Sequence, residues 1–184
     1  MEKIELKLIK VSDRLYYLPH YEKNDWCTVA LVIGDNHVMM LDSGASRRHV
    51  EMFMQQLEEN SLSKPDLCFL THWHWDHTYG LAHIDGVTSF ATKATNDLLK
   101  KMQGWGWSDE EMKERLKTGE DLEFSYPHIN DEYPDKSQIK IASATVTTVR
   151  WLIYLKKNVS SWVISTMKTC CRCSRCTTLT ATEN

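Results

Sequence analysis

The chain has 184 residues, of which 42% are hydrophobic and 26% charged, and its formal net charge is −3. These values are ordinary for one soluble globular domain, and they exclude a predominantly disordered chain. The slightly acidic balance gives no general attraction to nucleic acid, so we expect no nucleic-acid partner.

The first part of the chain predicts an antiparallel start to a sheet. Residues 4–8 alternate apolar and polar side chains, which is typical of a half-buried strand, and residues 15–18 predict the strand that pairs with it. Residues 28–33 and 37–41 are apolar runs that predict a hairpin. Its loop, residues 34–36, is Gly-Asp-Asn, and these residue types tolerate positive φ.

A change to alternating helices and strands follows. Ser46 can cap a helix over residues 47–59, which carries one apolar stripe. The stripe consists of Val50, Phe53, Met54 and Leu57. Residues 67–71 predict a short buried strand, so strand, helix and strand indicate one α/β crossover unit. A further strand over 87–91 and a helix over 93–102 continue the pattern.

The segment His72-Trp73-His74-Trp75-Asp76-His77 directly follows the strand at 67–71. In extended backbone, the period of two places His72 and His74 on the same side, where both imidazoles reach one cation. A turn after Trp75 aims Asp76 and His77 at a neighbouring position. The segment can therefore serve two metal ions, and mixed nitrogen and oxygen ligation suits zinc, with iron or manganese possible.

The alternative is a surface turn that happens to be rich in histidine, but this arrangement arises by chance in about one such chain in a thousand. Residues 71–80 resemble the signature of the metallo-β-lactamase-fold hydrolases. A second match is Met40-Leu41-Asp42-Ser43-Gly44, which resembles the aspartate-glycine turn of that family. The resemblance is good over about residues 3–90 and weakens after them.

The resemblance implies an αββα sandwich and a zinc-dependent hydrolase acting on a small-molecule substrate. Two zinc ions, one on His72 and His74 and one on Asp76 and His77, would lower the pKa of a shared water and polarise the scissile carbonyl or phosphoryl group. Asp76 would also orient the attacking hydroxide, which makes it the expected catalytic residue. The carboxylate of Asp42 would support the metal-binding loop from behind the ligands.

The family's remaining ligands are expected downstream, as a histidine in a Gly-His turn, a bridging aspartate and a final histidine. Here the histidines after His77 are His83 and His128, and the last aspartate is Asp135. We expect His83 to belong to the next turn and interpret His128 as a solvated loop residue. Two ligands per ion are fewer than the three typical of catalytic zinc, so we predict weak zinc uptake, fewer than two bound ions and little or no turnover.

The end of the chain differs in composition from the rest. Residues 137–184 carry seven basic side chains and one acidic one, and after Thr147 there is no glycine, proline, histidine or aspartate. We therefore divide the chain into a metallo-β-lactamase-like domain over 1–147, incomplete in its C-terminal half, and an atypical Cys/Thr-rich tail over 148–184.

Three explanations fit this tail. The one we favour is loss of the reading frame near Thr147, so that non-native sequence replaces the second half of the domain. A second is an appended zinc or iron-sulfur site formed by Cys170, Cys171, Cys173 and Cys176. The third is a divergent folded end with strands over 149–155 and 159–164.

Four tryptophans near the predicted site allow two interpretations. Trp105 and Trp107 form either a lid beside the site or, as we favour, a cover for the sheet edge. Trp73 and Trp75 either wall a substrate cleft or support the metal loop from behind.

We interpret Cys27 and Cys68 as buried small hydrophobes in strands, without a disulfide. Ser108 and Glu111 predict a capping box for a helix to about residue 117.

Two classes of function remain from the sequence. The first is a hydrolase of esters, thioesters, lactones, amides or phosphodiesters, and the second is a non-enzymatic metal-binding or interaction protein derived from the same fold. The N-terminal residues lack the apolar core of a secretion signal, and no apolar run approaches a membrane span. We therefore expect a cytoplasmic protein without a membrane partner. The sequence indicates no particular substrate or oligomeric state.

Overall fold

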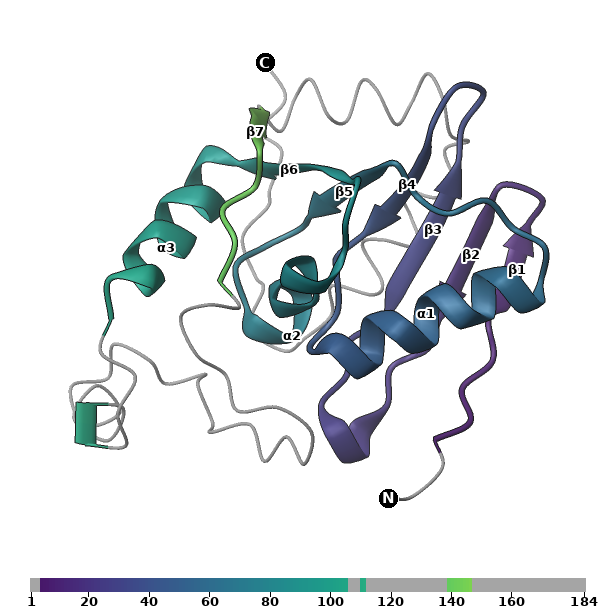
Figure 1. Ribbon diagram of the computed structural model, residues 1–184, viewed down its shortest axis with the longest axis horizontal. Helices are drawn as coiled ribbons and strands as arrows, with labels where there is room; N and C mark the ends of the chain where they lie inside the picture. Colours follow the sequence, from purple (N-terminus) through teal and green to yellow (C-terminus); the bar gives the residue numbers. More distant parts are fainter. Residues whose placement is uncertain (1–3, 106–109, 112–138, 147–184) are drawn as a thin grey trace, which may run out of the picture.

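A computed structural model describes residues 4–105, 110–111 and 139–146. Its seven strands form one sheet in the order in which they occur along the chain (Figure 1). The strands are β1 (Ile9–Ser12), β2 (Leu15–Leu18), β3 (Val29–Ile33), β4 (Val38–Leu41), β5 (Leu67–Leu70), β6 (Thr88–Thr92) and β7 (Ala144–Val146). The helices are α1 (Arg47–Glu59), α2 (Trp75–Thr78) and α3 (Lys93–Gln103), with short 3-10 helices η1 (Glu22–Asn24) and η2 (Tyr79–His83).

The sheet changes direction at β4, as the sequence predicts. Strands β1 to β4 pair antiparallel, whereas β4 to β7 pair parallel. In the β3–β4 hairpin, Gly34 N donates to His37 O at 2.8 Å. No residue of that loop has positive φ, so the predicted loop forms without using the left-handed region that its composition tolerates.

Among the elements that lie within the described residues, the first strand is the one that the prediction places wrongly. Residues 4–8 form no ladder, and β1 begins at Ile9. The apolar side chains at 4, 6 and 8 still pack against the core, and the backbone N–H of Leu8 donates to the side chain of Gln56 at 3.0 Å. The alternation therefore reflects packing of one side of an extended segment rather than strand pairing.

Helix α1 has the predicted bounds. Ser46 has extended backbone, and its side chain accepts a hydrogen bond from His49 N at 3.3 Å. Val50, Phe53 and Leu57 are buried, as predicted, and Met54 is partly buried. The helix therefore presents its apolar stripe to the sheet.

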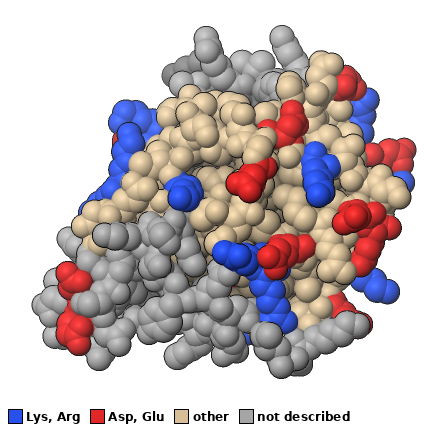
Figure 2. Space-filling view, in the orientation of Figure 1, with Lys and Arg blue, Asp and Glu red and all other residues tan. Residues whose placement is uncertain are grey.

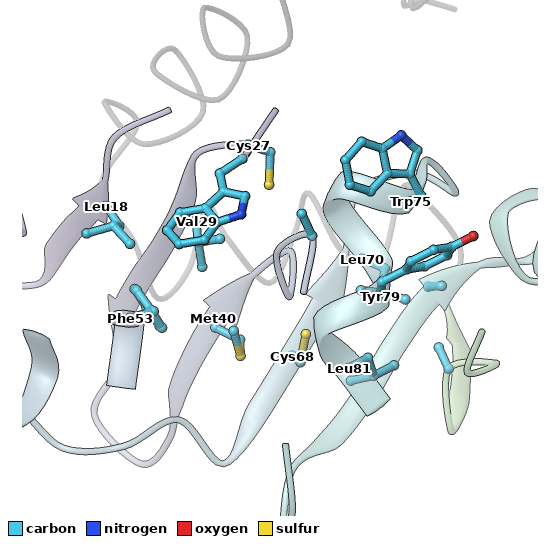
Figure 3. Close-up of a cluster of buried hydrophobic side chains, with 14 of the residues drawn as sticks. Leu18, Cys27, Val29, Met40, Phe53, Cys68, Leu70, Trp75, Tyr79 and Leu81 are labelled. Atoms are coloured by element: carbon cyan, nitrogen blue, oxygen red, sulfur yellow. The ribbon is translucent and has the colours of Figure 1, made fainter. Parts of the chain in front are cut away.

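Helices α1, α2 and α3 contribute to one core on the same face of the sheet (Figures 1 and 3). Leu31 and Met40 face this core from neighbouring strands. A second core on the opposite face contains Leu15, Val32, Met39, Leu41 and Phe69. Side chains thus alternate between the two faces along β3 and β4. The described residues supply one sheet and one helical layer of the expected αββα sandwich.

Several predicted features lie outside the described residues. They are Trp107, His128, the tail over 148–184 and the part of the predicted helix that follows Glu111. The domain boundary at 147 stays a prediction.

Within the described part, no helix combines the length and apolar composition needed to cross a membrane. On the face shown in Figure 2, basic and acidic side chains of the described residues are interspersed.

Candidate metal centre

The site is built where β4 and β5 end side by side. Because these strands are parallel, their carboxyl ends meet at the same edge of the sheet, and Asp42 and Thr71 are the first residues beyond them. Asp42 N donates to Phe69 O at 2.8 Å, and Asp42 Oδ1 accepts from Thr71 N at 2.7 Å. Asp42 has φ of 60°, a conformation that costs free energy and collects at functional sites. Its carboxylate is therefore fixed under the following loop.

The loop after β5 brings the four predicted ligands into one cluster. The backbone remains extended at His74, and α2 begins at Trp75, close to the predicted turn. The ring of His72 lies 4.5 Å from the ring of His74 and 4.1 Å from that of His77, measured between centroids. Asp76 Oδ2 lies 3.1 Å from His77 Nε2. The two predicted ligand pairs therefore lie beside each other.

His77 is oriented by Asp42. The distance between His77 Nδ1 and Asp42 Oδ2 is 2.7 Å, and Nε2 is on the side of Asp76. Burial would lower the pKa of His77, but its neighbours Cys27, Asp42 and Asp76 outweigh burial and raise this pKa well above its usual range. A carboxylate on one ring nitrogen is the arrangement that orients a metal-binding imidazole through its other nitrogen.

His72 is held in one tautomer by Thr71. The Thr71 hydroxyl lies 2.8 Å from Asp42 Oδ2 and 2.9 Å from His72 Nδ1. A hydroxyl has one proton, which the Asp42 carboxylate accepts, so His72 Nδ1 donates and its Nε2 keeps a lone pair. Burial, followed by the positive charge of His77, lowers the pKa of His72 to about 4. His72 is thus a neutral imidazole, the form that binds metal.

Asp76 supplies an anionic oxygen. Burial would raise the pKa of Asp76, but the hydrogen bond from His77 and the nearby histidines His77, His72 and His74 lower it. The cluster therefore offers one carboxylate and three imidazoles, which is a donor set suited to zinc. The residues present fit the metal that the sequence predicts.

Cys27 belongs to the same cluster, which the sequence analysis missed. It is buried, as predicted, but it lies before β3 rather than in a strand. Its thiol donates to the backbone oxygen of Asp76 at 2.9 Å, and burial raises its pKa to about 11. Among the described residues, Cys27, Asp76 and His77 form the one group of three potential ligands whose atoms all lie within 4.8 Å of one another.

Close backbone contact joins the two sequence matches. Ser43 N donates to His77 O at 2.8 Å, and Gly80 N donates to Gly44 O at 2.8 Å. A Cβ atom on Gly80 would lie 1.9 Å from Ser43 O, so a side chain cannot fit there. Glycine at position 80 lets the segment with the candidate ligands pack directly on the turn that follows Asp42.

The aromatic residues near the site have different roles. Trp75 is buried in the core with Tyr79 and supports the loop from behind (Figure 3). Trp73 is partly buried, and its ring meets the ring of His74 edge-on, with centroids 4.7 Å apart. Trp105 is partly buried against the core, which favours the covering role over a lid. His83 ends η2, in the turn where it was expected.

Solved structures with a similar fold include hydrolases of two kinds. The DIM-1 metallo-β-lactamase exposed to ceftazidime is 24% identical, with 56% of this chain and 50% of that chain covered and a TM-score of 0.46. VMB-1 is 19% identical, with 80% and 54% covered and a TM-score of 0.48. The sec-alkylsulfatase Pisa1 from Pseudomonas sp. is 20% identical, with 50% and 16% covered and a TM-score of 0.44.

The chain spans about half the length of DIM-1 and of VMB-1. No curated protein matches it. The sequence pattern of the metallo-beta-lactamase superfamily matches residues 26–161, which is well over half of the chain and includes every residue of the candidate centre. The chain belongs to the metallo-β-lactamase superfamily.

Proposed function

We propose that this chain is a zinc-dependent hydrolase, with His72 and His74 holding one ion and Asp76 and His77 holding a second. The observation that carries the proposal is the chain of contacts from Asp42 to His77 and onward to Asp76 and His72. The His77 and His72 ring centroids are 4.1 Å apart, and His77 Nε2 is 3.1 Å from Asp76 Oδ2, which supports shared metal binding by these residues. Iron or manganese would suit the same nitrogen and oxygen ligands.

Zinc at this position would lower the pKa of a coordinated water and polarise the bond to be cleaved. The side chains supply the orientation. Ionised Asp76 is placed to accept a hydrogen bond from the attacking water and to orient it. Asp42 and Thr71 fix the ring nitrogens of His77 and His72, so that neither ring turns away during the reaction.

The substrate class follows from the family only in outline. An ester, thioester, lactone, amide or phosphodiester is compatible with attack by an activated water. The fold hosts many chemistries, and loops around the site select among them. The candidates are therefore small molecules with a hydrolysable carbonyl or phosphoryl group.

A second candidate is a metal-binding protein without enzymatic activity. It is favoured by the sequence after His77, in which the downstream histidine and aspartate ligands of the family have no matching motif. Two side chains per ion leave each zinc short of the three protein ligands typical of catalytic sites. For the 184-residue chain we expect weak zinc uptake and little turnover.

Metal content tests the site. Zinc bound per chain is measured after dialysis, for the wild type and for the His72→Ala/His74→Ala double variant, with His37→Ala as the control at an exposed histidine. We expect less than one zinc per wild-type chain and a lower zinc content in the double variant alone. Two tightly held ions would contradict the incomplete site, and unchanged binding in the double variant would contradict these ligands.

Turnover separates the two functions. The same proteins, with Asp76→Asn and the exposed control Asp85→Asn, are screened with zinc against thioester, lactone, β-lactam and phosphodiester substrates. Zinc-dependent turnover that Asp76→Asn abolishes and Asp85→Asn retains supports the hydrolase. Zinc binding without turnover on any of them supports the non-enzymatic alternative.

A further inference from the structure

We propose that Cys27 is a third protein ligand for the zinc ion held by Asp76 and His77. This inference rests on the proposed metal site and adds a ligand that lies outside the histidine-rich segment. The ligand atoms of the three residues all lie within 4.8 Å of one another. The residues come from two separate parts of the chain, the segment before β3 and helix α2.

The distances suit a zinc ion after a small adjustment. With zinc bonds of about 2.0 Å to nitrogen and oxygen and about 2.3 Å to sulfur, tetrahedral ligand atoms lie roughly 3.3 to 3.6 Å apart. Asp76 Oδ2 and His77 Nε2 are 3.1 Å apart, which is close to one edge of such a tetrahedron. The remaining edges are at most 4.8 Å long, so they need at most roughly 1.5 Å of movement. Rotation of the Asp76 carboxylate and the Cys27 thiol would supply it.

Cys27 is held in place from behind. Its neighbour Trp26 is fully buried and forms an isolated bridge with Tyr21 through two backbone hydrogen bonds of 3.0 and 3.1 Å. The Trp26 ring stacks on His49 with centroids 4.6 Å apart and an interplanar angle of 4°. His49 in turn accepts a hydrogen bond from Ala45 N at 3.2 Å. These contacts fix the backbone next to Cys27. Figure 3 shows Cys27 at one edge of the core.

A cysteine changes what this site can bind. Asp76 and His77 alone give the ion two protein ligands, whereas Cys27 brings the number to the three that leave one position open for water. It does so without any residue from the downstream half of the family's ligand set. Sulfur ligation also favours zinc and cobalt over manganese and magnesium, which prefer oxygen. The ordinary alternative is a buried thiol that only donates to Asp76 O.

Cobalt spectroscopy distinguishes these roles, because a thiolate bound to Co²⁺ gives a charge-transfer band in the near ultraviolet that nitrogen and oxygen ligands do not give. The chain has six cysteines, so the decisive protein is a full chain in which Cys27 is the remaining one. It carries Cys68→Ser with serine at the four tail positions, which are Cys170, Cys171, Cys173 and Cys176. This variant leaves the proposed ligand intact, so its result does not depend on disturbing Cys27.

We expect the Cys27-only chain to show the charge-transfer band. In the otherwise native chain, we expect Cys27→Ser to lower zinc affinity on the order of 100-fold. Cys68→Ser is the matched control at a buried cysteine, and its zinc affinity should not change. Cobalt binding without the band in the Cys27-only chain would overturn the inference. If this cobalt binding is nevertheless lost when His72→Ala and His74→Ala are introduced, the proposed function survives. Absence of cobalt and zinc binding in every protein, including the wild type, would instead remove the proposed site and this inference together.

Discussion

Asp42 and His77 are 35 residues apart in the chain, and their side chains meet at 2.7 Å between Oδ2 and Nδ1. The same carboxylate accepts the hydroxyl and the backbone N–H of Thr71. One side chain thus orients a predicted ligand and fixes the start of the loop that carries the others. The strained φ of 60° at Asp42 is maintained by these bonds and by the contact of Asp42 N with Phe69 O.

Asp42→Asn should weaken metal binding without removing a ligand. The amide has nearly the same size, but it has one acceptor oxygen and no negative charge for His77 and Thr71. We expect zinc affinity to fall about 10- to 100-fold, the usual cost of losing a residue that orients a ligand. Competition with a chromophoric chelator measures this, with exposed Asp85→Asn as the control. Equal affinity in both variants would show that Asp42 does not orient the site.

Gly80→Ala should destabilise the fold around the site. The new methyl group would lie 1.9 Å from Ser43 O and 2.5 Å from Val50 Cγ2, and the first of these contacts is with backbone that cannot move aside easily. We expect a loss of about 3 kcal/mol in the free energy of unfolding, or failure to fold, from overpacking. Urea denaturation measures it. Gly104→Ala is the control, because its Cβ would lie 3.3 Å from Lys101 O, and similar losses in both variants would contradict the steric argument.

The sequence predicts those parts of the fold that depend on local signals. Helix α1 has a capping serine and a regular apolar stripe, so both its ends could be placed. The β3–β4 hairpin and the crossover to β5 follow from apolar runs separated by turn residues. The proposed metal-binding segment is recognisable because its candidate ligands lie within six residues of one another. In each of these cases the neighbours that determine the structure are close in the chain.

The features that were missed depend on contacts between distant residues. Cys27 and Asp76 are separated by 49 positions, and no spacing pattern in the sequence joins them. An isolated cysteine in an apolar context is most simply a core residue, and only the packing of α2 against the segment before β3 brings it to the metal site. Likewise, residues 4–8 alternate as a strand would, but they belong to no strand, and the backbone N–H of Leu8 donates to the side chain of Gln56 in α1.

Asp66 should make stability depend on pH in the acid range. Burial would raise the pKa of Asp66, but the hydrogen bonds from His37 and Val38 outweigh burial and lower it. A carboxyl group with a lowered folded pKa stabilises the fold above its unfolded pKa of about 4, and this contribution is lost as pH falls through the folded pKa. Because the side chains of Asp66 and His37 are both about half exposed, we expect this contribution to the free energy of unfolding to be at most about 1 kcal/mol.

Asp66→Asn tests this contribution. Its free energy of unfolding should lie below that of the wild type at pH 6, where Asp66 is ionised, and the difference should shrink toward pH 3. Urea denaturation at several pH values gives both quantities. Asp85→Asn, at another exposed position, should show no such trend. A difference for Asp66→Asn that stays constant from pH 6 to pH 3 would rule out the ionised carboxylate as its source.

Ser46→Ala should destabilise α1 at the end nearest the site. The Ser46 side chain is buried and accepts from His49 N, so alanine leaves that N–H without this acceptor. We expect the free energy of unfolding to fall by about 1 kcal/mol. Ser63→Ala, in the exposed loop before β5, is the control and should leave the free energy of unfolding nearly unchanged. Thermal or urea denaturation measures both. Because His49 stacks on Trp26 beside Cys27, Ser46→Ala should also weaken zinc binding slightly, whereas an unchanged affinity would show that the helix end and the metal site are independent.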